Sequence, residues 1–278
     1  MRVFSDENEP EHYYMKRHDI TRKEVIIMSI SAVYFSPTKS TQKVTETIAE
    51  VFGAYEKIDL TDRALIEQKI FSARDIMIIG VPSYGGRVPA AALEKMKGYE
   101  GNGAKAVLIT VYGNRAYEDT LKELQDFLEE RKFKCVAAVA AIAEHSIMHQ
   151  FATGRPDARD LAQLSEFADR IMDKPESEKD GELQVPGNFP YRIYKGVPLK
   201  PKAGKDCTKC GLCASKCPVG AIPTDNPKIT DKSKCISCMR CLQICPSHAR
   251  KISRLKVKLA STKMKKACEA RKDNELFL

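Results

Sequence analysis

The sequence CTKCGLCASKCP at residues 207–218 returns as CISCMRCLQICP at residues 235–246. Both stretches have the pattern C-x2-C-x2-C-x3-C-P, and each cysteine of the second copy lies 28 positions after its counterpart. Together they contain eight of the ten cysteines of the chain. A repeat of this kind indicates that the eight thiols serve one purpose and that this part of the chain folds around them.

The spacing is typical of cysteines that hold iron–sulfur clusters, as in the bacterial-type ferredoxins that this region resembles. Three thiolates separated by two residues can bind three corners of one cubane, while the chain carries the fourth cysteine to the other cluster. We therefore expect two 4Fe-4S clusters. Cluster I would be held by Cys207, Cys210, Cys213 and Cys245, and cluster II by Cys235, Cys238, Cys241 and Cys217.

Zinc sites and disulfides are the alternative uses of these cysteines. A zinc site needs four ligands, typically in two C-x2-C pairs, and does not require two copies of a four-cysteine run. A disulfide framework is unusual in a chain of 278 residues, and cluster thiolates indicate a reducing compartment. The two remaining cysteines lie outside the repeats: Cys135 is interpreted as a small buried hydrophobe, and Cys268 lies in a lysine-rich tail.

Length and composition are those of a globular protein. The chain has 278 residues with 43% hydrophobic content, enough for one large domain or two ordinary ones. Residues 1–28 are polar and charged without the apolar core of a signal peptide, so we interpret them as an extension that could be disordered. No apolar run approaches the length of a transmembrane helix. The sequence therefore predicts a soluble, cytoplasmic protein.

The formal net charge of +9 could suggest nucleic-acid binding. Residues 202–250 carry nine Lys and Arg against three Asp, but this is also the region of the two predicted clusters. An oxidised all-thiolate cluster carries about −2, so two clusters would offset much of this excess. No nucleic-acid motif accompanies it. We interpret the basic residues as counter-charge and expect no nucleic-acid partner.

Upstream of the cysteines, apolar segments rich in β-branched residues alternate with amphipathic helical segments. This alternation indicates an α/β domain with a parallel sheet, in which ligands bind beyond the carboxyl ends of the strands. The sequence predicts strands at 25–35, 55–60, 75–81, 105–112 and 134–143, and helices at 42–52, 90–97, 118–132 and 157–172.

Three of the loops that follow these strands have the composition of ligand-binding loops. SPTKST, at 36–41, leads into a helix, where free N–H groups, the helix dipole and hydroxyls suit an anion; an ordinary helix cap is the alternative. PSYGGRVP, at 82–89, allows close approach of the backbone to a ligand. GNRAY, at 113–117, follows the fourth strand.

Residues 29–172 resemble a flavodoxin, with these loops in the places of the family's phosphate loop and two flavin loops. The resemblance implies a doubly wound parallel five-stranded sheet of order 2-1-3-4-5 and a bound FMN. Around the phosphate it would place Ser36, Thr38, Lys39, Ser40 and Thr41. Around the flavin it would place Pro82, Ser83, Tyr84, Gly85 and Gly86, with Tyr84 and Gly85 on one side of the isoalloxazine and Gly113, Asn114 and Tyr117 on the other.

Two features depart from the usual flavodoxin. The family usually has glycine where this chain has Lys39, so a slightly different path of the phosphate loop is expected. The chain contains no Trp, so ring stacking falls to tyrosine. A flavodoxin-like domain that has lost its flavin stays as an alternative.

The order of the two regions resembles the flavodoxin–ferredoxin fusion (ferrodoxin) family of anaerobic prokaryotes. We expect an extension at 1–28, a flavodoxin-like domain at 29–172, a linker at 173–200, a small α+β ferredoxin domain at 201–250 and a basic helical tail at 251–278. The tail is interpreted as a docked amphipathic helix. A docking patch for an acidic redox partner, or a weak membrane-surface contact, is the alternative.

These expectations combine into an iron–sulfur flavoprotein. It would transfer electrons between two 4Fe-4S clusters and FMN, linking one-electron redox proteins to a two-electron partner or small-molecule acceptor. A true reductase would show an open cavity lined by Arg87, Arg115 or His149, and a redox-sensing or assembly protein would hold clusters without flavin. His145 and His149 follow the fifth strand, as loop residues or with a catalytic role. No catalytic residue is assigned.

Overall fold

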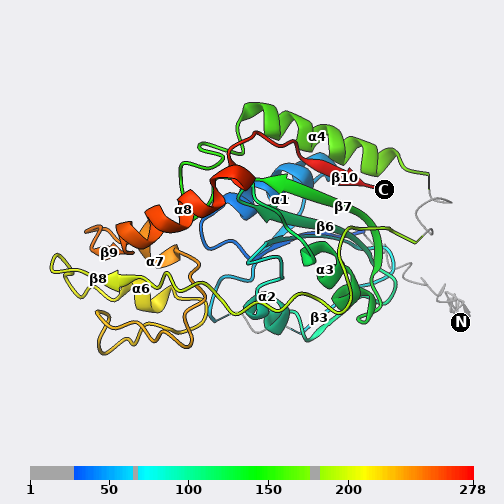
Figure 1. Ribbon diagram of the computed structural model, residues 1–278. Helices are drawn as coiled ribbons and strands as arrows, with labels where there is room; N and C mark the ends of the chain where they lie inside the picture. The colour runs from blue at the N-terminus through cyan, green and yellow to red at the C-terminus, as the bar shows by residue number, and fades with distance from the viewer. Residues whose placement is uncertain (1–27, 65–67, 176–181) are drawn as a thin grey trace, which may run out of the picture.

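The computed structural model describes residues 28–64, 68–175 and 182–278, so the expected extension at 1–28 lies outside the described residues except for Met28. Figure 1 shows a large α/β body and a smaller lobe, drawn in yellow and orange, beside one end of its sheet. Among the described residues no helix is long and apolar enough to cross a membrane.

Five parallel strands form the centre of the body. Their order is β2-β1-β4-β6-β7, and each neighbouring pair is parallel. Numbered without the short β3 and β5, this is the order 2-1-3-4-5, which confirms the predicted flavodoxin-like sheet. The strands are β1 (Ile30–Tyr34), β2 (Glu56–Asp59), β4 (Ile76–Pro82), β6 (Lys105–Tyr112) and β7 (Lys134–Ile142).

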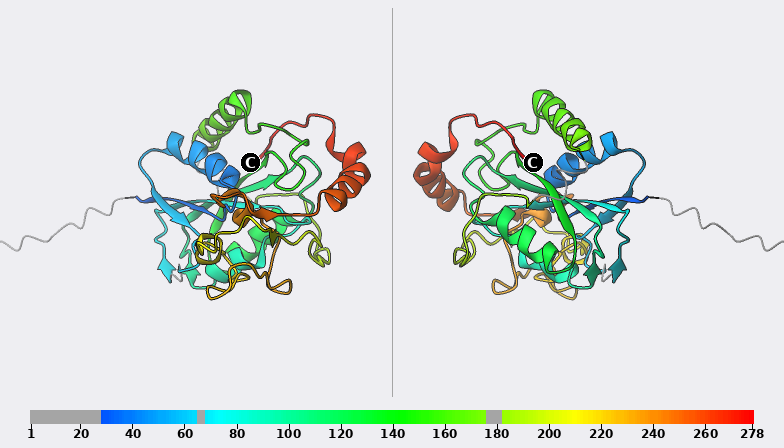
Figure 2. Two further views of the ribbon diagram at one scale, coloured as in Figure 1. Left: turned by 90° about the vertical axis from the view of Figure 1, so that its left-hand side faces the viewer. Right: turned by 90° about the vertical axis from the view of Figure 1, so that its right-hand side faces the viewer.

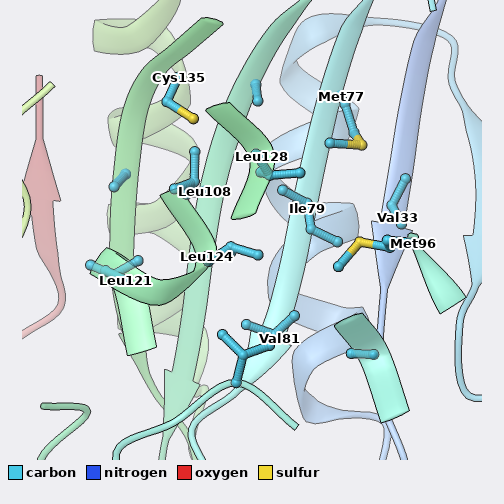
Figure 3. Close-up of a cluster of buried hydrophobic side chains, with 14 of the residues drawn as sticks. Val33, Met77, Ile79, Val81, Met96, Leu108, Leu121, Leu124, Leu128 and Cys135 are labelled. Atoms are coloured by element: carbon cyan, nitrogen blue, oxygen red, sulfur yellow. The ribbon is translucent and has the colours of Figure 1, made fainter. Parts of the chain in front are cut away.

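Helices cover both faces of this sheet, which is why its central strands are apolar throughout rather than alternating. On one face, α1 (Ser40–Phe52) and α4 (Ala158–Asp173) pack against side chains such as Ile78 and Ile109. On the other, α2 (Ala90–Lys95) and α3 (Thr120–Glu129) cover the cluster drawn in Figure 3. Cys135 belongs to that cluster, and burial raises the pKa of its thiol far above the usual range.

A sixth strand, which the sequence did not predict, comes from the C-terminal tail. After α8 (Arg254–Cys268) the chain returns to the body, and β10 (Glu275–Phe277) pairs antiparallel with the edge strand β7. Just before it, the buried Asn274 accepts a hydrogen bond from the backbone N–H of Ile142 (2.9 Å) and donates one to Gln163 (2.8 Å). The tail thus closes an edge that would otherwise expose unpaired backbone groups.

The remaining strands form two small sheets. In the body, β3 (Lys69–Ile70) pairs in parallel with β5 (Tyr99–Glu100). In the lobe, β8 (Lys202–Ala203) pairs antiparallel with β9 (Arg250–Lys251), around the short helices α6 (Leu212–Ser215) and α7 (Arg240–Gln243). The lobe is therefore a small α+β unit, as expected.

The described part of the linker is attached to the body. The carboxylate of Asp119 accepts hydrogen bonds from the backbone N–H groups of Asn188 (2.9 Å) and Arg192 (2.7 Å). The hydroxyl of Tyr191 donates to Asp126 (2.6 Å). These bonds lower the pKa of Asp119 against the opposing effect of burial. The lobe is therefore connected to the body through an anchored segment on its N-terminal side.

We expect Asn274→Ala to loosen the edge of the sheet. The substitution leaves the buried Ile142 N–H without its acceptor, a loss of about 1–3 kcal/mol. Native-state hydrogen exchange followed by mass spectrometry should therefore show about one to two orders of magnitude faster exchange in peptides from β7.

The neighbouring substitution Asp273→Ala is the matched control. Asp273 is exposed and pairs only at 3.8 Å with the exposed Arg159, a contact of small energy. Its exchange pattern should match that of the unaltered protein. Equal exchange in the two variants would show that the Asn274 bonds do not hold the strand.

Candidate functional site

A cavity lies where the carboxyl ends of β1, β4, β6 and β7 meet the lobe. Its volume is about 130 Å³, and it opens to solvent. Eight of the predicted flavin-binding residues line it: Thr38, Ser40, Thr41, Pro82, Ser83, Tyr84, Gly85 and Gly113. The strand order places the three loops of these residues side by side at the switch point of the sheet.

The phosphate loop takes the path that a glycine would favour, although Lys39 stands there. Lys39 has φ 70° and immediately precedes α1, so a side chain occupies a left-handed position. Hydrogen bonds around it hold the loop: Ser36 Oγ accepts from the Gln42 N–H (2.8 Å), and the Ser36 N–H donates to Thr61 Oγ1 (2.6 Å). The left-handed conformation costs about 1–2 kcal/mol at a non-glycine residue. The fold imposes this geometry despite the lysine.

Backbone donors at the start of α1 are available to a ligand. The N–H groups of Thr38, Ser40 and Thr41 have no hydrogen-bond partner among the described residues. All three residues line the cavity, and they lie at the positive end of a helix of 13 residues. Free N–H groups at such an end favour a phosphate or another anion.

The second loop brings the backbone close to an aromatic ring of the linker. Gly85 has φ 63°, and a Cβ built on it would collide with the ring of Tyr194, which also lines the cavity. Burial raises the pKa of Tyr84 well above its usual range, and the nearby Cys238 and Tyr194 add to the rise. Tyr84, in the loop at 82–89, therefore lies near Cys238 of the cluster II set.

The third loop is only partly where the resemblance placed it. Gly113 lines the cavity, and a Cβ on it would lie 2.8 Å from the ring of His145. Asn114 and Tyr117 do not line it. The Asn114 amide donates to the carbonyls of Cys268 and Ala270 (both 2.7 Å), while the Tyr117 ring is buried and its hydroxyl bonds Glu275 (3.2 Å).

Three further predicted residues lie off the cavity wall. Ser36 is buried behind the phosphate loop, and Lys39 extends to an adjacent groove, where its Nζ donates to Gln42 (2.9 Å). Gly86 is buried, and its carbonyl accepts from the Asp119 N–H (3.1 Å). Ser36 and Gly86 therefore shape the loops from outside the cavity.

His145 presents a fixed tautomer to the cavity. Its Nδ1 accepts hydrogen bonds from the N–H groups of Ile147 (3.1 Å) and Met148 (3.2 Å), so the proton of the neutral ring lies on Nε2. Burial lowers the pKa of His145 to about 4, which keeps the ring neutral near pH 7. Its Nε2 has no hydrogen-bond partner among the described residues.

The cysteines predicted for cluster II lie close together. Burial raises the pKa values of Cys238 and Cys241 to about 12, and mutual interactions with Cys217 and Cys235 add to both shifts. Within the described ranges no three His, Cys, Asp or Glu side chains are gathered tightly enough for a single metal ion. A cubane offers each thiolate its own iron, so its ligands need not be as close as those of one ion.

The cysteines predicted for cluster I differ widely in their exposure to solvent. Cys213 is in α6 and buried, whereas Cys207 is half-buried and Cys210 exposed. Cys245 follows α7, which contacts α6. Burial raises the pKa of the Cys245 thiol. Hydrogen bonds from the N–H groups of Arg250 and Ala249 and from Ser247 outweigh this effect, so the pKa of Cys245 is lowered.

The lobe forms one wall of the cavity. Ile236 and Ser237, which lie between Cys235 and Cys238, line it together with Val197 of the linker. Ser237 Oγ donates to the Val197 carbonyl (3.1 Å), and Gln243 Nε2 donates to the carbonyl of Thr38 in the phosphate loop (3.2 Å). In the left-hand view of Figure 2, the lobe faces the viewer and lies across the end of the sheet.

Sequence reasoning missed this wall. The resemblance to flavodoxins covers only residues 29–172. It therefore assigned no cavity residue to the linker or to the turns that contain the cysteines. The aromatic content of the linker, including Tyr194, was the available signal that this segment packs against a domain.

Comparisons with known proteins identify the lobe and the body separately. Residues 199–250 match the family model of a 4Fe-4S dicluster domain. No curated protein sequence matches the chain.

Solved structures similar to the body include three with flavin-related names. A flavodoxin from the domain Archaea shares 15% identity, covering 53% of this chain and 98% of its own, with a TM-score of 0.40. Oxidised flavodoxin 2 from Bacillus cereus shares 15%, covering 53% and 99%, with a TM-score of 0.37. An apo NADH:FMN oxidoreductase shares 16%, covering 55% and 94%, with a TM-score of 0.41.

These TM-scores are low. The body is therefore assigned a flavodoxin-like fold from its strand order and not from the structural matches. The lobe is identified separately, by its own family model. The chain is thus a flavodoxin-like domain followed by a 4Fe-4S dicluster domain, the architecture of a flavodoxin–ferredoxin fusion.

Proposed function

We propose that the protein transfers electrons between two 4Fe-4S clusters and FMN within one chain, linking one-electron carriers to a partner or substrate that takes two electrons. A cluster exchanges single electrons and a flavin can hold one or two, so the two kinds of cofactor together supply that conversion. The protein contributes the positions of the sites, the exclusion of water and the surrounding charge.

One observation carries the proposal. The turn that separates Cys235 from Cys238 contributes Ile236 and Ser237 to the wall of the cavity at the switch point. The same two residues therefore border the expected flavin site and connect two expected cluster ligands. A ferredoxin domain attached only as a tethered carrier would not need this shared wall.

The cavity has the features that FMN requires. The free N–H groups of Thr38, Ser40 and Thr41 suit its phosphate. Tyr84 and Tyr194 offer aromatic faces to a ring system, and Gly85 lets the backbone approach closely. His145 adds a neutral Nε2–H donor.

The cysteine sets also fit their clusters. Cys213, Cys217 and Cys238 are buried, and apolar side chains such as Ile222 and Met239 exclude water from them. Limited solvent access and hydrogen bonds to sulfur are the means by which a protein tunes such sites. The Ala221 N–H bonds the sulfur of Cys217 (3.3 Å).

The reductase alternative receives no support from the cavity lining. Arg87, Arg115 and His149 all lie outside that lining. Arg87 binds Glu123, Arg115 binds Glu118, and His149 binds Glu144, so each is engaged elsewhere.

Cysteine substitutions test the arrangement. We expect about eight irons and one FMN per chain after anaerobic purification, and about four irons in either Cys241→Ala or Cys210→Ala. Because cluster II would lie beside the cavity, Cys241→Ala should strongly slow flavin reduction by a small one-electron donor. Cys210→Ala, at the distant cluster, should slow it much less.

Stopped-flow spectra at the flavin and cluster bands would separate these outcomes. Equal flavin reduction in both variants and in the unaltered protein would refute the proposed path. Iron without FMN in the purified protein would favour the redox-sensing alternative.

A glycine substitution tests the flavin site. Gly85→Ala places a Cβ at a left-handed position and into the Tyr194 ring, so FMN affinity should fall about tenfold or more, or at least 1.4 kcal/mol. Titration of FMN into flavin-free protein, followed by fluorescence quenching, measures the change.

Gly53→Ala is the matched control, because Gly53 has φ 119° with no atom within 4 Å of its built Cβ, at the far end of α1. Alanine at φ 119° and ψ −153° should carry a backbone cost at least as large as at Gly85, and it should still leave FMN affinity unaltered. A parallel loss of affinity in both variants would mean that general destabilisation, and not the cavity, is responsible.

A further inference from the structure

The two predicted cluster sites differ in their access to solvent. In the cluster II set, Cys217 and Cys238 are 8% and 9% exposed. Gly220, just after Cys217, lies near Arg63 of the body, and Ser237, just before Cys238, lines the cavity. In the cluster I set, Cys210 is exposed and Cys207 half-buried. If electrons follow the proposed path, an external carrier reaches the chain at cluster I. The inference below rests on that proposed function.

The surface around this exposed turn is basic and its charges are unpaired. Lys202, Lys205, Lys209 and Lys216 are all exposed, and none has an ion-pair partner among the described residues. The nearby acidic residue, Asp206, pairs with Lys251 (3.6 Å). Even after an oxidised cluster of about −2 is counted, these four lysines leave an excess of positive charge.

Several lysines of the body differ in this respect. Lys57 pairs with Glu46, Lys97 with Glu94, and Lys122 with Asp126. Ion pairs of this kind cancel the field that a surface presents to an approaching protein. The four unpaired lysines of the lobe keep their electrostatic field, and such a field steers oppositely charged partners.

Helix α8 extends the basic surface and adds an apolar contact. It follows β9 closely in the chain and lies beside the lobe in Figure 1. Leu255 and Leu259, one turn apart, are 68% and 58% exposed, with Lys256 and Lys258 exposed beside them. An apolar centre with a charged rim is the usual composition of a protein–protein interface.

We propose that the lobe face formed by Lys202, Lys205, Lys209 and Lys216, continued by α8, docks an acidic one-electron carrier protein. The carrier presents Asp and Glu around its own redox centre and delivers or receives one electron at cluster I. In the reducing direction the carrier is oxidised, cluster I is reduced, and no bond forms or breaks. An anionic membrane could bind the same lysines. It would not explain why the thiol of Cys210, in the cluster I set, is exposed among them.

Charge reversal tests this surface in the full, cofactor-loaded protein. The probe is an acidic bacterial two-cluster ferredoxin. We expect Lys209→Glu with Lys216→Glu to weaken complex formation, measured by calorimetry, and to lower the second-order rate constant by about tenfold at low salt. The difference should shrink as salt rises from about 0.05 to 0.5 M, because screening removes the field.

The control pair is Lys132→Glu with Lys134→Glu. It makes the same change of charge at the start of β7, the end of the sheet opposite the cavity. Binding and rate should stay close to those of the unaltered protein. Equal losses in both pairs, or no loss in either, would overturn the docking surface.

Two further measurements separate this inference from the proposed function. The 5-deazariboflavin radical, formed in light with EDTA as the electron source, is an uncharged one-electron donor, so it should reduce the flavin equally in all variants if the internal path exists. Failure of that reduction in the unaltered protein would refute the path, while calorimetry would still decide the docking. Binding to phosphatidylserine vesicles, lost on charge reversal and without a ferredoxin complex, would replace the carrier with a membrane.

Discussion

The pairing of β10 with β7 determines how the two parts of the chain are held together. A lobe joined to the body by one linker could swing freely, and a wall shared with the cavity would then not persist. Here the chain leaves the body through a segment bonded to Asp119 and returns as a strand of the sheet. Each bond contributes only about 0.5–1.5 kcal/mol net, but together they attach the lobe at both ends.

The returning tail also changes what the third loop does. In an isolated flavodoxin-like domain, Asn114 and Tyr117 would be free to face a flavin, which is why the resemblance placed them there. In this chain they bond Cys268, Ala270 and Glu275 of the tail. Arg155, which lies between β7 and α4, also binds the tail. It pairs with the buried Asp160 and donates a hydrogen bond to the Lys272 carbonyl (2.8 Å). The third loop therefore holds the tail through hydrogen bonds. Tyr194 of the linker lines the cavity instead of Asn114 and Tyr117.

These differences show what the sequence can and cannot predict. The alternation of strands and helices followed from local patterns, because apolar runs such as 105–112 alternate with amphipathic helical segments. The strand order itself came from the resemblance to flavodoxins. Local patterns also placed the loops at 36–41 and 82–89 at the carboxyl ends of β1 and β4, because both loops follow buried strands directly. A strand as short as Glu275–Phe277 has no such signature. Its position depends on an unpaired edge of β7 far away in the chain, which no local pattern records.

The phosphate loop shows a second limit, this time of resemblance. The lysine at position 39 predicted a slightly different loop path from that of flavodoxins, and Lys39 adopts a left-handed conformation, which glycine reaches most easily. The surrounding bonds, from Ser36 to both Gln42 and Thr61, outweigh a backbone cost of about 1–2 kcal/mol. Composition alone could not reveal this, because the compensating Thr61 follows a different strand.

The distribution of charge in the lobe gives its two faces different environments. Toward the body, Cys217 and Cys238 are buried, with apolar side chains between them and water. Toward solvent, Cys210 lies among lysines that have no acidic partner. Burial penalises added negative charge, whereas nearby cations favour it. The same cofactor type would therefore sit in two unequal electrostatic settings along one path. A repeat of identical cysteine spacing thus gives two sets of thiols that the fold makes different, one beside the cavity at the switch point and one with Cys210 exposed among lysines.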